Sequence, residues 1–117
     1  MILASAFATE EGFWADGSRP MRDDNPGDLR DAPWLTHPKH DGGFWMADSV
    51  AEGVAGLYHQ LALDIVRGMT PRQLVAAWAP AADGNATEKY LADILRMTGI
   101  ANADTPLWNL LTIRRLG

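Results

Sequence analysis

The chain of 117 residues contains no cysteine, which excludes disulfide bonds, a thiol nucleophile and cysteine-based zinc fingers. It has no apolar run near the roughly 18 residues of a membrane-spanning helix, so we expect no membrane span. Basic residues are also scarce, since 10 Lys and Arg against 15 Asp and Glu give a net charge of −5. Because nucleic-acid-binding domains usually carry a basic face, we expect no nucleic-acid partner.

Also missing are a Ser-His-Asp set, a phosphate loop and a dinucleotide fingerprint, so we expect no cofactor. Apolar residues make up 47% of the chain and charged residues 21%, as in globular proteins. The length suits a single domain, 1–117, whose core needs no metal or disulfide. The first residues contain an Ala-x-Ala sequence but lack the charged and long apolar regions of a signal peptide, so we expect a helix there and another route for any export.

Five helices are predicted from apolar residues at helical spacing, together with start and stop signals. They run from residue 2 to Gly12, from Ser49 to Gly68, from Thr70 to Pro80, from Asn85 to Gly99 and from Thr105 to Leu116. Ser49 with Glu52 and Thr70 with Gln73 have the spacing of capping boxes.

Residues 12–48 are rich in glycine and proline, which excludes a long helix there. Phe44–Met46 follow Gly42 and Gly43 and predict a short strand in a small hairpin. The predicted fold is therefore mainly α, with a helical lobe and a small irregular or β-hairpin lobe. An irregular stretch this long usually carries function, so we expect the site in a cleft between the two lobes.

Glu10 and Glu11 end the first predicted helix and are the first candidates for chemistry. A carboxylic acid works as a general acid near neutral pH only where its pKa is raised, as burial or the negative end of a helix dipole can do. Phe13 and Trp14 lie close by in the sequence and offer an apolar wall. Two glutamates on a helix are more often simply solvated, and helical spacing does not choose between them.

The second candidate is the segment from Arg22 to Arg30, which contains Asn25-Pro26-Gly27. Asn-Pro-Gly is typical of a tight turn, because proline fixes φ and glycine accepts a positive φ. Such a turn can aim an Asn side chain into a cleft, although a plain surface turn explains the same pattern.

Two weaker candidates follow. His37, His40 and Asp41 offer nitrogen and oxygen ligands for a metal, but Pro38 breaks any helix that would align them, so a polar loop is the simpler interpretation and we predict no metal. Aromatic and polar side chains that suit a sugar ring follow later, although such residues are more often a core tryptophan and an ordinary helix cap. These side chains are Trp78, Asn85, Thr87 and Tyr90.

Taken together, these segments resemble the phage-type peptidoglycan hydrolases of the lysozyme-like superfamily. The resemblance rests on Glu11-Gly12-Phe13 and on the later Arg22-x-x-Asn25-Pro26-Gly27-x-Leu29, and it extends over nearly the whole chain. Weaker matches are Trp45-Met46-Ala47-Asp48-Ser49 with Gly53, Trp78-Ala79-Pro80, Asn85-Ala86-Thr87 and Tyr90. The chain departs from the family pattern at Asp24 and Asp28, where the family has Asn.

The resemblance implies a lysozyme-like fold and cleavage of the β-1,4 bond between N-acetylmuramic acid and N-acetylglucosamine. It selects Glu11 over Glu10 as the general acid. Asp24 and Asp28 are candidates for a second carboxylate from their sequence position alone, and Asp24 is the one predicted to be catalytic. Substrate binding is expected of Arg22, Asn25, Asp28, Trp78, Asn85, Thr87 and Tyr90. Hydrolysis and lytic transglycosylation both remain open.

The expected partner is the glycan strand of peptidoglycan in the bacterial cell wall. Because an acidic protein is repelled by an anionic wall, we expect a virion or a larger tethering protein to deliver it. Two other functions compete with glycan cleavage: a non-catalytic peptidoglycan-binding or virion structural domain, and a metallopeptidase that uses His37 and His40.

Overall fold

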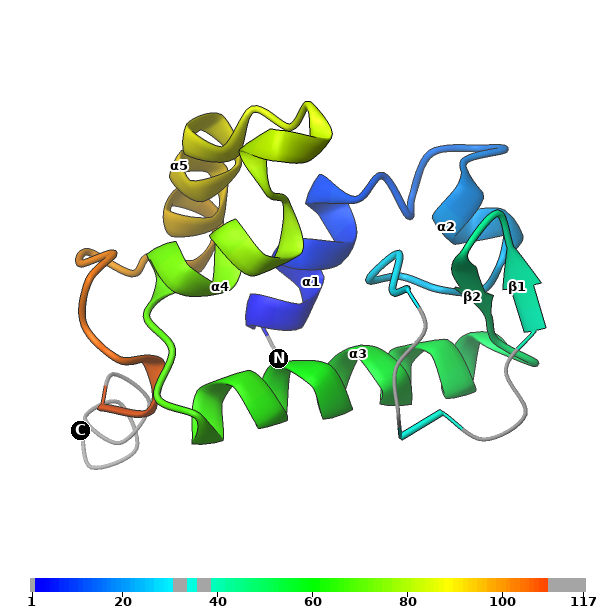
Figure 1. Ribbon diagram of the computed structural model, residues 1–117, viewed down its shortest axis with the longest axis horizontal. Helices are drawn as coiled ribbons and strands as arrows, with labels where there is room; N and C mark the ends of the chain where they lie inside the picture. Colours follow the sequence, from blue (N-terminus) through cyan, green and yellow to red (C-terminus); the bar gives the residue numbers. More distant parts are fainter. Residues whose placement is uncertain (1, 31–33, 36–38, 110–117) are drawn as a thin grey trace. The chain divides into compact units, whose positions relative to one another are not determined.

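The computed structural model describes residues 2–30, 34–35 and 39–109. Its elements are α1 (Ile2–Glu10), α2 (Arg19–Arg22), β1 (Lys39–Asp41), β2 (Phe44–Met46), α3 (Val50–Val66), α4 (Pro71–Trp78), the short 3-10 helix η1 (Ala81–Asp83) and α5 (Thr87–Thr98) (Figure 1). The prediction of a mainly α fold with a small hairpin is confirmed. The chain forms two compact units, Met1–Gln60 and Leu61–Gly117, so the boundary between them falls within α3.

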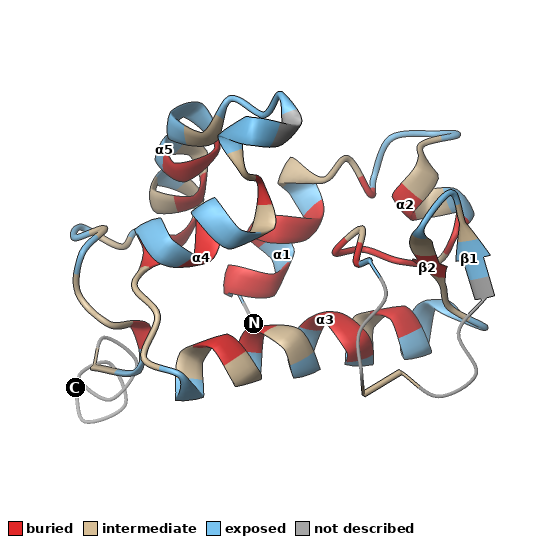
Figure 2. Cartoon of the chain, viewed as in Figure 1, coloured by how far each residue is buried: buried red, intermediate tan, exposed pale blue. Residues whose placement is uncertain are grey.

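The N-terminal unit is built around apolar side chains from elements that are far apart in the sequence. Phe7 of α1 is fully buried, and Phe13, Leu29, Trp45 and Leu57 are nearly so. Figure 2 shows buried residues on α1, on the chain that follows α2 and along α3. The irregular stretch that follows α1 therefore contributes to the core of this unit as well as to its surface.

The hairpin forms where the sequence predicts it. Gly42 and Gly43 both have positive φ, 59° and 88°, which a two-residue hairpin turn of type I′ requires. The antiparallel register pairs His40 with Trp45. The Trp45 N–H donates to the Leu29 carbonyl at 2.8 Å, which ties β2 to the preceding loop.

The predicted helix ends mostly agree with the structure. The Thr70 hydroxyl accepts from the Gln73 N–H, and the Gln73 side chain accepts from the Thr70 N–H, so this capping box is complete. The Ser49 hydroxyl likewise accepts from the Glu52 N–H at 3.1 Å. Gly99 takes a left-handed conformation after α5, as a helix stop signal predicts.

One helix start was predicted wrongly. The N-cap of α5 is Ala86 rather than Asn85, and among the described residues no side-chain hydrogen bond caps this end. The Asn85 amide instead donates to the Pro80 carbonyl at 3.0 Å and so serves the preceding loop. Of the predicted helix from Thr105 to Leu116, residues 107–109 are helical and the remainder lies outside the described residues.

The C-terminal unit is centred on the contact between α4 and α5. Leu74 and Val75 of α4 and Ile94 of α5 are almost completely buried, and Leu107 adds to this core.

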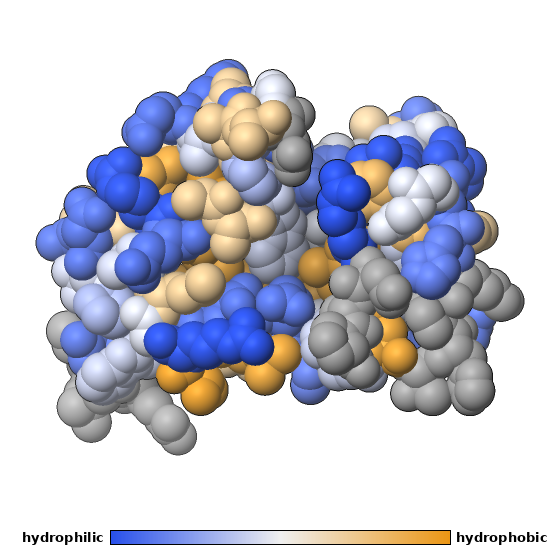
Figure 3. All heavy atoms as spheres, viewed as in Figure 1, coloured by the Kyte–Doolittle hydropathy of each residue, from blue (hydrophilic) through white to orange (hydrophobic). Residues whose placement is uncertain are grey.

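Apolar side chains also reach the surface at Val50 and Val66, the two ends of α3, and Figure 3 shows hydrophobic surface among the hydrophilic residues. Within the described ranges, no helix has both the length and the apolar character to cross a membrane.

Candidate functional site

Glu11 occupies the joint at which α1 ends and the chain reverses. Gly12 has a φ of 78°, and its N–H donates to the Thr9 carbonyl at 3.0 Å. The Phe13 N–H reaches back to the Ala8 carbonyl, also at 3.0 Å. This pair of bonds is a Schellman motif with Glu11 as the C-cap, so glycine is needed at position 12 for its left-handed backbone.

The apolar wall predicted beside Glu11 is present in part. Phe7 and Phe13 are buried, whereas the Trp14 side chain is 63% exposed. Glu10 and Glu11 are both half-buried, so burial alone does not separate them. What separates them is position, because Glu10 is the last residue of α1 and Glu11 is held by the turn that follows.

Asn25 fixes the shape of the Asn-Pro-Gly loop from within. Its side chain is fully buried, and its amide donates to the carbonyls of Leu29 at 3.0 Å and Trp45 at 2.9 Å. Its side-chain oxygen accepts from the Leu29 N–H at 3.0 Å. Three bonds to the backbone give Asn25 a structural position in the loop, whereas the sequence predicted an Asn aimed at substrate.

Asp24 and Asp28, the two departures from the family pattern, both have a left-handed backbone, with φ of 52° and 46°. Asn and Asp tolerate this conformation better than other residues with a side chain, so Asp at these two positions is compatible with the loop geometry. Asp24 is half-buried. The Asp28 carboxylate, with only 7% of its side chain exposed, forms a two-point ion pair with Arg19 at 2.9 and 2.5 Å.

Arg22 lies on the exposed side of the same loop and binds Asp41 of β1, with its Nη2 2.6 Å from the carboxylate. Its Nε is 3.9 Å from Asp23, whose carboxyl group is completely buried and receives no hydrogen bond from the described residues. Burial first, and then interaction with the Asp41 carboxyl group, raise the pKa of Asp23. Arg22 lowers the pKa of Asp41. Arg22 is therefore already engaged with two carboxyl groups of its own chain.

Two glycines of α3 allow this loop to lie directly against the helix. A Cβ at Gly53 would overlap the Asp24 carbonyl oxygen and meet the Pro26 ring at 3.0 Å. A Cβ at Gly56 would lie 2.5 Å from the Trp45 ring. The close approach of the Asn-Pro-Gly loop therefore requires glycine at position 53.

The other predicted site residues belong to the C-terminal unit. The Thr87 hydroxyl donates to the Ala79 carbonyl at 2.8 Å, and the Asn85 amide donates to Pro80 as described above. These two bonds join the ends of the loop from residue 79 to residue 87. Trp78 is half-buried at the end of α4, and Tyr90 is buried on α5. Their contact with substrate remains a prediction.

The alternative metal site gains no support from the part of the chain that the structure describes. No group of three or more His, Asp or Glu side chains in that part is placed to hold a metal ion. His40 is exposed on β1, Asp41 is paired with Arg22, and His37 lies outside the described residues.

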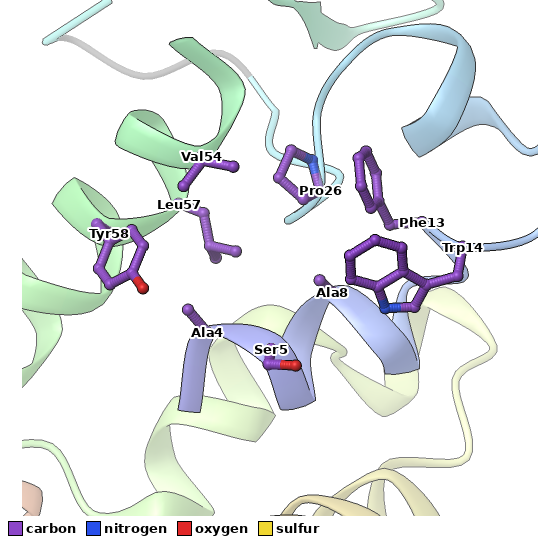
Figure 4. Close-up of a pocket in the computed structure, with 9 residues that line it drawn as sticks. All are labelled: Ala4, Ser5, Ala8, Phe13, Trp14, Pro26, Val54, Leu57 and Tyr58. Carbon is purple, nitrogen blue, oxygen red and sulfur yellow. The ribbon is translucent and has the colours of Figure 1, made fainter. Parts of the chain in front are cut away.

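A pocket of about 250 Å³ lies within the N-terminal unit, between α1 and the first half of α3 (Figure 4). Its lining residues are Ala4, Ser5 and Ala8 of α1, then Phe13, Trp14 and Pro26, and Val54, Leu57 and Tyr58 of α3. Sequence reasoning did not find this pocket, although the unusual Phe13-Trp14 pair directly after a helix stop was a signal for it. It also missed Asp23, whose burial depends on contacts across the fold.

The chain was compared with protein-family models, with curated protein sequences and with solved structures, and nothing matched.

Proposed function

We propose that this protein is a peptidoglycan hydrolase with a lysozyme-like fold, and that Glu11 is its general acid. The observation that carries the proposal is the Schellman motif at the end of α1. It gives each residue of Glu11-Gly12-Phe13 a distinct geometric role, since the motif places the carboxylic acid at the C-cap, the left-handed turn at the glycine and a buried aromatic wall after it.

The chemistry follows from this placement. As the bond between two sugars breaks, the departing oxygen needs a proton, which Glu11 would donate while positive charge develops on the sugar carbon. Donation requires that Glu11 hold its proton at the working pH. Glu11 is half-buried and directly follows α1, at the end where the helix dipole is negative. Lysozyme itself, from the superfamily that this chain resembles, uses a glutamic acid in this way, so its behaviour is no independent test of the proposal.

A second carboxylate would then act as nucleophile or as the base for a water molecule, according to its distance from Glu11. Arg19 already holds the Asp28 carboxylate in an ion pair, so Asp24 is the stronger of the two candidates for the second carboxylate. If Asp24 does not take part, an acetamido or 6-hydroxyl group of the substrate would attack, and the reaction would be a lytic transglycosylation.

The test is cleavage of purified peptidoglycan by the wild type, Glu11→Gln and Glu10→Gln, with products identified by mass. We expect Glu11→Gln to abolish cleavage and to leave the thermal midpoint unchanged, while Glu10→Gln retains activity. Anhydro ends would identify transglycosylation, and free reducing ends would identify hydrolysis. Equal loss in both variants, or loss in neither, would refute the assignment of Glu11.

One observation favours a second candidate, a peptidoglycan-binding domain without catalysis. Two polar side chains of the Asn-Pro-Gly loop bond within the protein, because Asn25 bonds to the Leu29 backbone and Asp28 forms an ion pair with Arg19. A wild type that pellets with the wall and releases no muropeptides would support this candidate.

A further inference from the structure

Arg22, the last residue of α2, lies between two carboxyl groups that differ sharply in exposure. Its Nη2 is 2.6 Å from the Asp41 carboxylate of β1, and its Nε is 3.9 Å from the Asp23 carboxyl group. We propose that Arg22 is a pH-controlled latch, which holds β1 through Asp41 while Asp23 is protonated and turns to Asp23 when that group ionises. The exchange of partners frees β1 and the hairpin turn from α2. It is independent of any reaction at Glu11 and so goes beyond the proposed function.

The first reason is the environment of Asp23. Its side chain is completely buried, and neither carboxyl oxygen has a hydrogen-bond partner among the described residues. A neutral carboxylic acid is tolerated in such a place, whereas a carboxylate there needs a cation or hydrogen-bond donors. Burial first, and then the Asp41 carboxyl group, raise the pKa of Asp23. Asp23 therefore releases its proton to water only as the pH rises above the range that is usual for Asp.

The second reason is that Arg22 is the nearby cation best able to move. Charged residues on three segments act on the Asp23 carboxyl group: Arg19 and Arg22 of α2, Asp28 of the loop and Asp41 of β1. The other strand, β2, carries no charged residue. Arg19 makes a two-point ion pair with Asp28, and its departure would leave that buried carboxylate without a cation. By contrast, 56% of the Arg22 side chain is exposed, so it can turn without breaking a buried contact.

The third reason is the difference in strength between the two ion pairs that Arg22 can form. Its present pair is with Asp41, whose side chain is 32% exposed, and such pairs contribute little because water screens them. An ionised Asp23 would be a completely buried charge, for which an adjacent cation matters far more. Once Asp23 ionises, pairing with it is therefore favoured over pairing with Asp41.

The two strands of the hairpin are held in different ways, which determines what the exchange sets free. β2 is fixed by backbone groups, because the Trp45 N–H donates to the Leu29 carbonyl and the Trp45 carbonyl accepts from the Asn25 amide. β1 is linked to α2 by the ion pair of Asp41 with Arg22. A two-stranded hairpin is only marginally stable by itself. We therefore expect loss of this ion pair to make the hairpin turn more mobile while β2 stays in place.

NMR spectroscopy of the 117-residue chain from about pH 4 to about pH 9 tests the latch. The signals to follow are the Asp23 carboxyl carbon, the Arg22 Nε–H group and the backbone amides of the turn Gly42-Gly43. We expect all of them to change with one common midpoint, and the order parameter of the turn to fall from about 0.85 to below about 0.6. Arg72 is the internal control, because its Nε donates to Asp104 at 2.9 Å in another exposed ion pair, and its signal should not change at that midpoint.

Two variants separate the titrating group from the latch. Asp23→Asn removes the titration, so the Arg22 signal and the mobility of the turn should keep their acidic values at every pH. Arg22→Gln removes the latch, so the turn should be mobile at every pH. Asp23 should still titrate in this variant, with a higher midpoint, because the cation that favours its ionised form is gone. Since the Arg22 side chain is exposed, this variant should fold even if Asp23→Asn does not.

Each signal has an outcome that would overturn the proposal. An Arg22 signal that stays constant while Asp23 titrates would overturn the exchange of partners. A turn that stays rigid above the midpoint, or in Arg22→Gln, would overturn the release of β1. Ionisation of Asp23 at or below the usual pKa of Asp would overturn both. None of these signals depends on cleavage of peptidoglycan, so failure of the latch and failure of the proposed function are seen separately.

Discussion

Arg22 binds the Asp41 carboxylate through its Nη2 at 2.6 Å, whereas its Nε stays 3.9 Å from the buried Asp23 carboxyl group. The Asp23 carboxyl group is completely buried and receives no hydrogen bond from the described residues. Burial first, and then the Asp41 carboxyl group, raise the pKa of Asp23. The neutral form of Asp23 is therefore favoured over the ionised form beside Asp41.

This pair makes the stability of the N-terminal unit depend on pH. The pKa of folded Asp23 is raised above its ordinary value, so its contribution is present at acidic pH and is lost as the pH rises through the raised pKa. Arg22 lowers the pKa of Asp41, so the contribution of Asp41 to stability is lost only as the pH falls through this lowered pKa. We expect stability to peak between the two.

Asp23→Asn should remove the loss of stability on the alkaline side, because an amide stays neutral at any pH and so avoids the cost of burying a charge. We expect it to stabilise the protein by about 1 kcal/mol at pH 7.5 and by less at about pH 4 to 5, the range near the ordinary pKa of Asp. Urea unfolding followed by tryptophan fluorescence measures this. Asp16→Asn, at an exposed position, is the control, and a uniform destabilisation by Asp23→Asn at every pH would contradict the raised pKa of Asp23.

Gly53→Ala should destabilise the N-terminal unit by about 3 kcal/mol, because the new methyl group overlaps a backbone carbonyl that cannot swing away. Helix propensity alone predicts the opposite, a gain of about 1 kcal/mol. Ala55→Gly, at an exposed position of the same helix, provides the comparison and should cost about 1 kcal/mol. A stability gain in Gly53→Ala would show that the Asp24 loop does not lie against α3.

Asp24 can be tested for chemistry and for conformation with two substitutions. Asp24→Asn keeps a residue that accepts the left-handed backbone, so we expect the free energy of unfolding to change by less than about 0.5 kcal/mol. If Asp24 is the second carboxylate, the same variant should lose roughly 100-fold or more in muropeptide release. Asp24→Ala should lose this activity and also about 1 kcal/mol of stability. Full activity in Asp24→Asn would remove Asp24 from the mechanism.

Arg19→Ala should leave the Asp28 carboxylate without its partner and cost about 1 to 2 kcal/mol, a value kept modest because 40% of the Arg19 side chain is exposed. The Arg19 guanidinium also lies 3.4 Å from the centre of the Phe44 ring, so the loss includes a cation–π contact. Unfolding of both single variants and of Arg19→Ala with Asp28→Asn gives the coupling between them. Additive effects would show that the ion pair contributes nothing to stability.

The helix ends and the hairpin were predictable because their signals are local. Thr70 and Gln73 are three residues apart, and the Gly42-Gly43 pair specifies its own turn. Asn85 shows the limit of such signals. Its side chain was predicted to cap the helix that follows, but it bonds to the Pro80 carbonyl of the preceding loop. Nothing within a few residues of Asn85 distinguishes these outcomes.

The inner arrangement of the candidate site could not be predicted in this way. The sequence places Asn25 in a turn, but its complete burial depends on Trp45, twenty residues away. The burial of Asp23 and the ion pair of Asp28 likewise depend on the packing of distant segments. A polar residue in a loop rich in turn residues predicts exposure unless such distant contacts are known.

Gly53 and Gly56 of α3 determine where along the helix the Asn-Pro-Gly loop can pack. They are three residues apart and so lie on the same side of the helix, one against the Asp24 backbone and one against Trp45. Inserting one residue between Ser49 and Gly53 would rotate both by about 100° and bring larger side chains under the loop. Insertions and deletions should therefore be tolerated poorly just before Gly53, even though residues 48–52 are exposed to solvent.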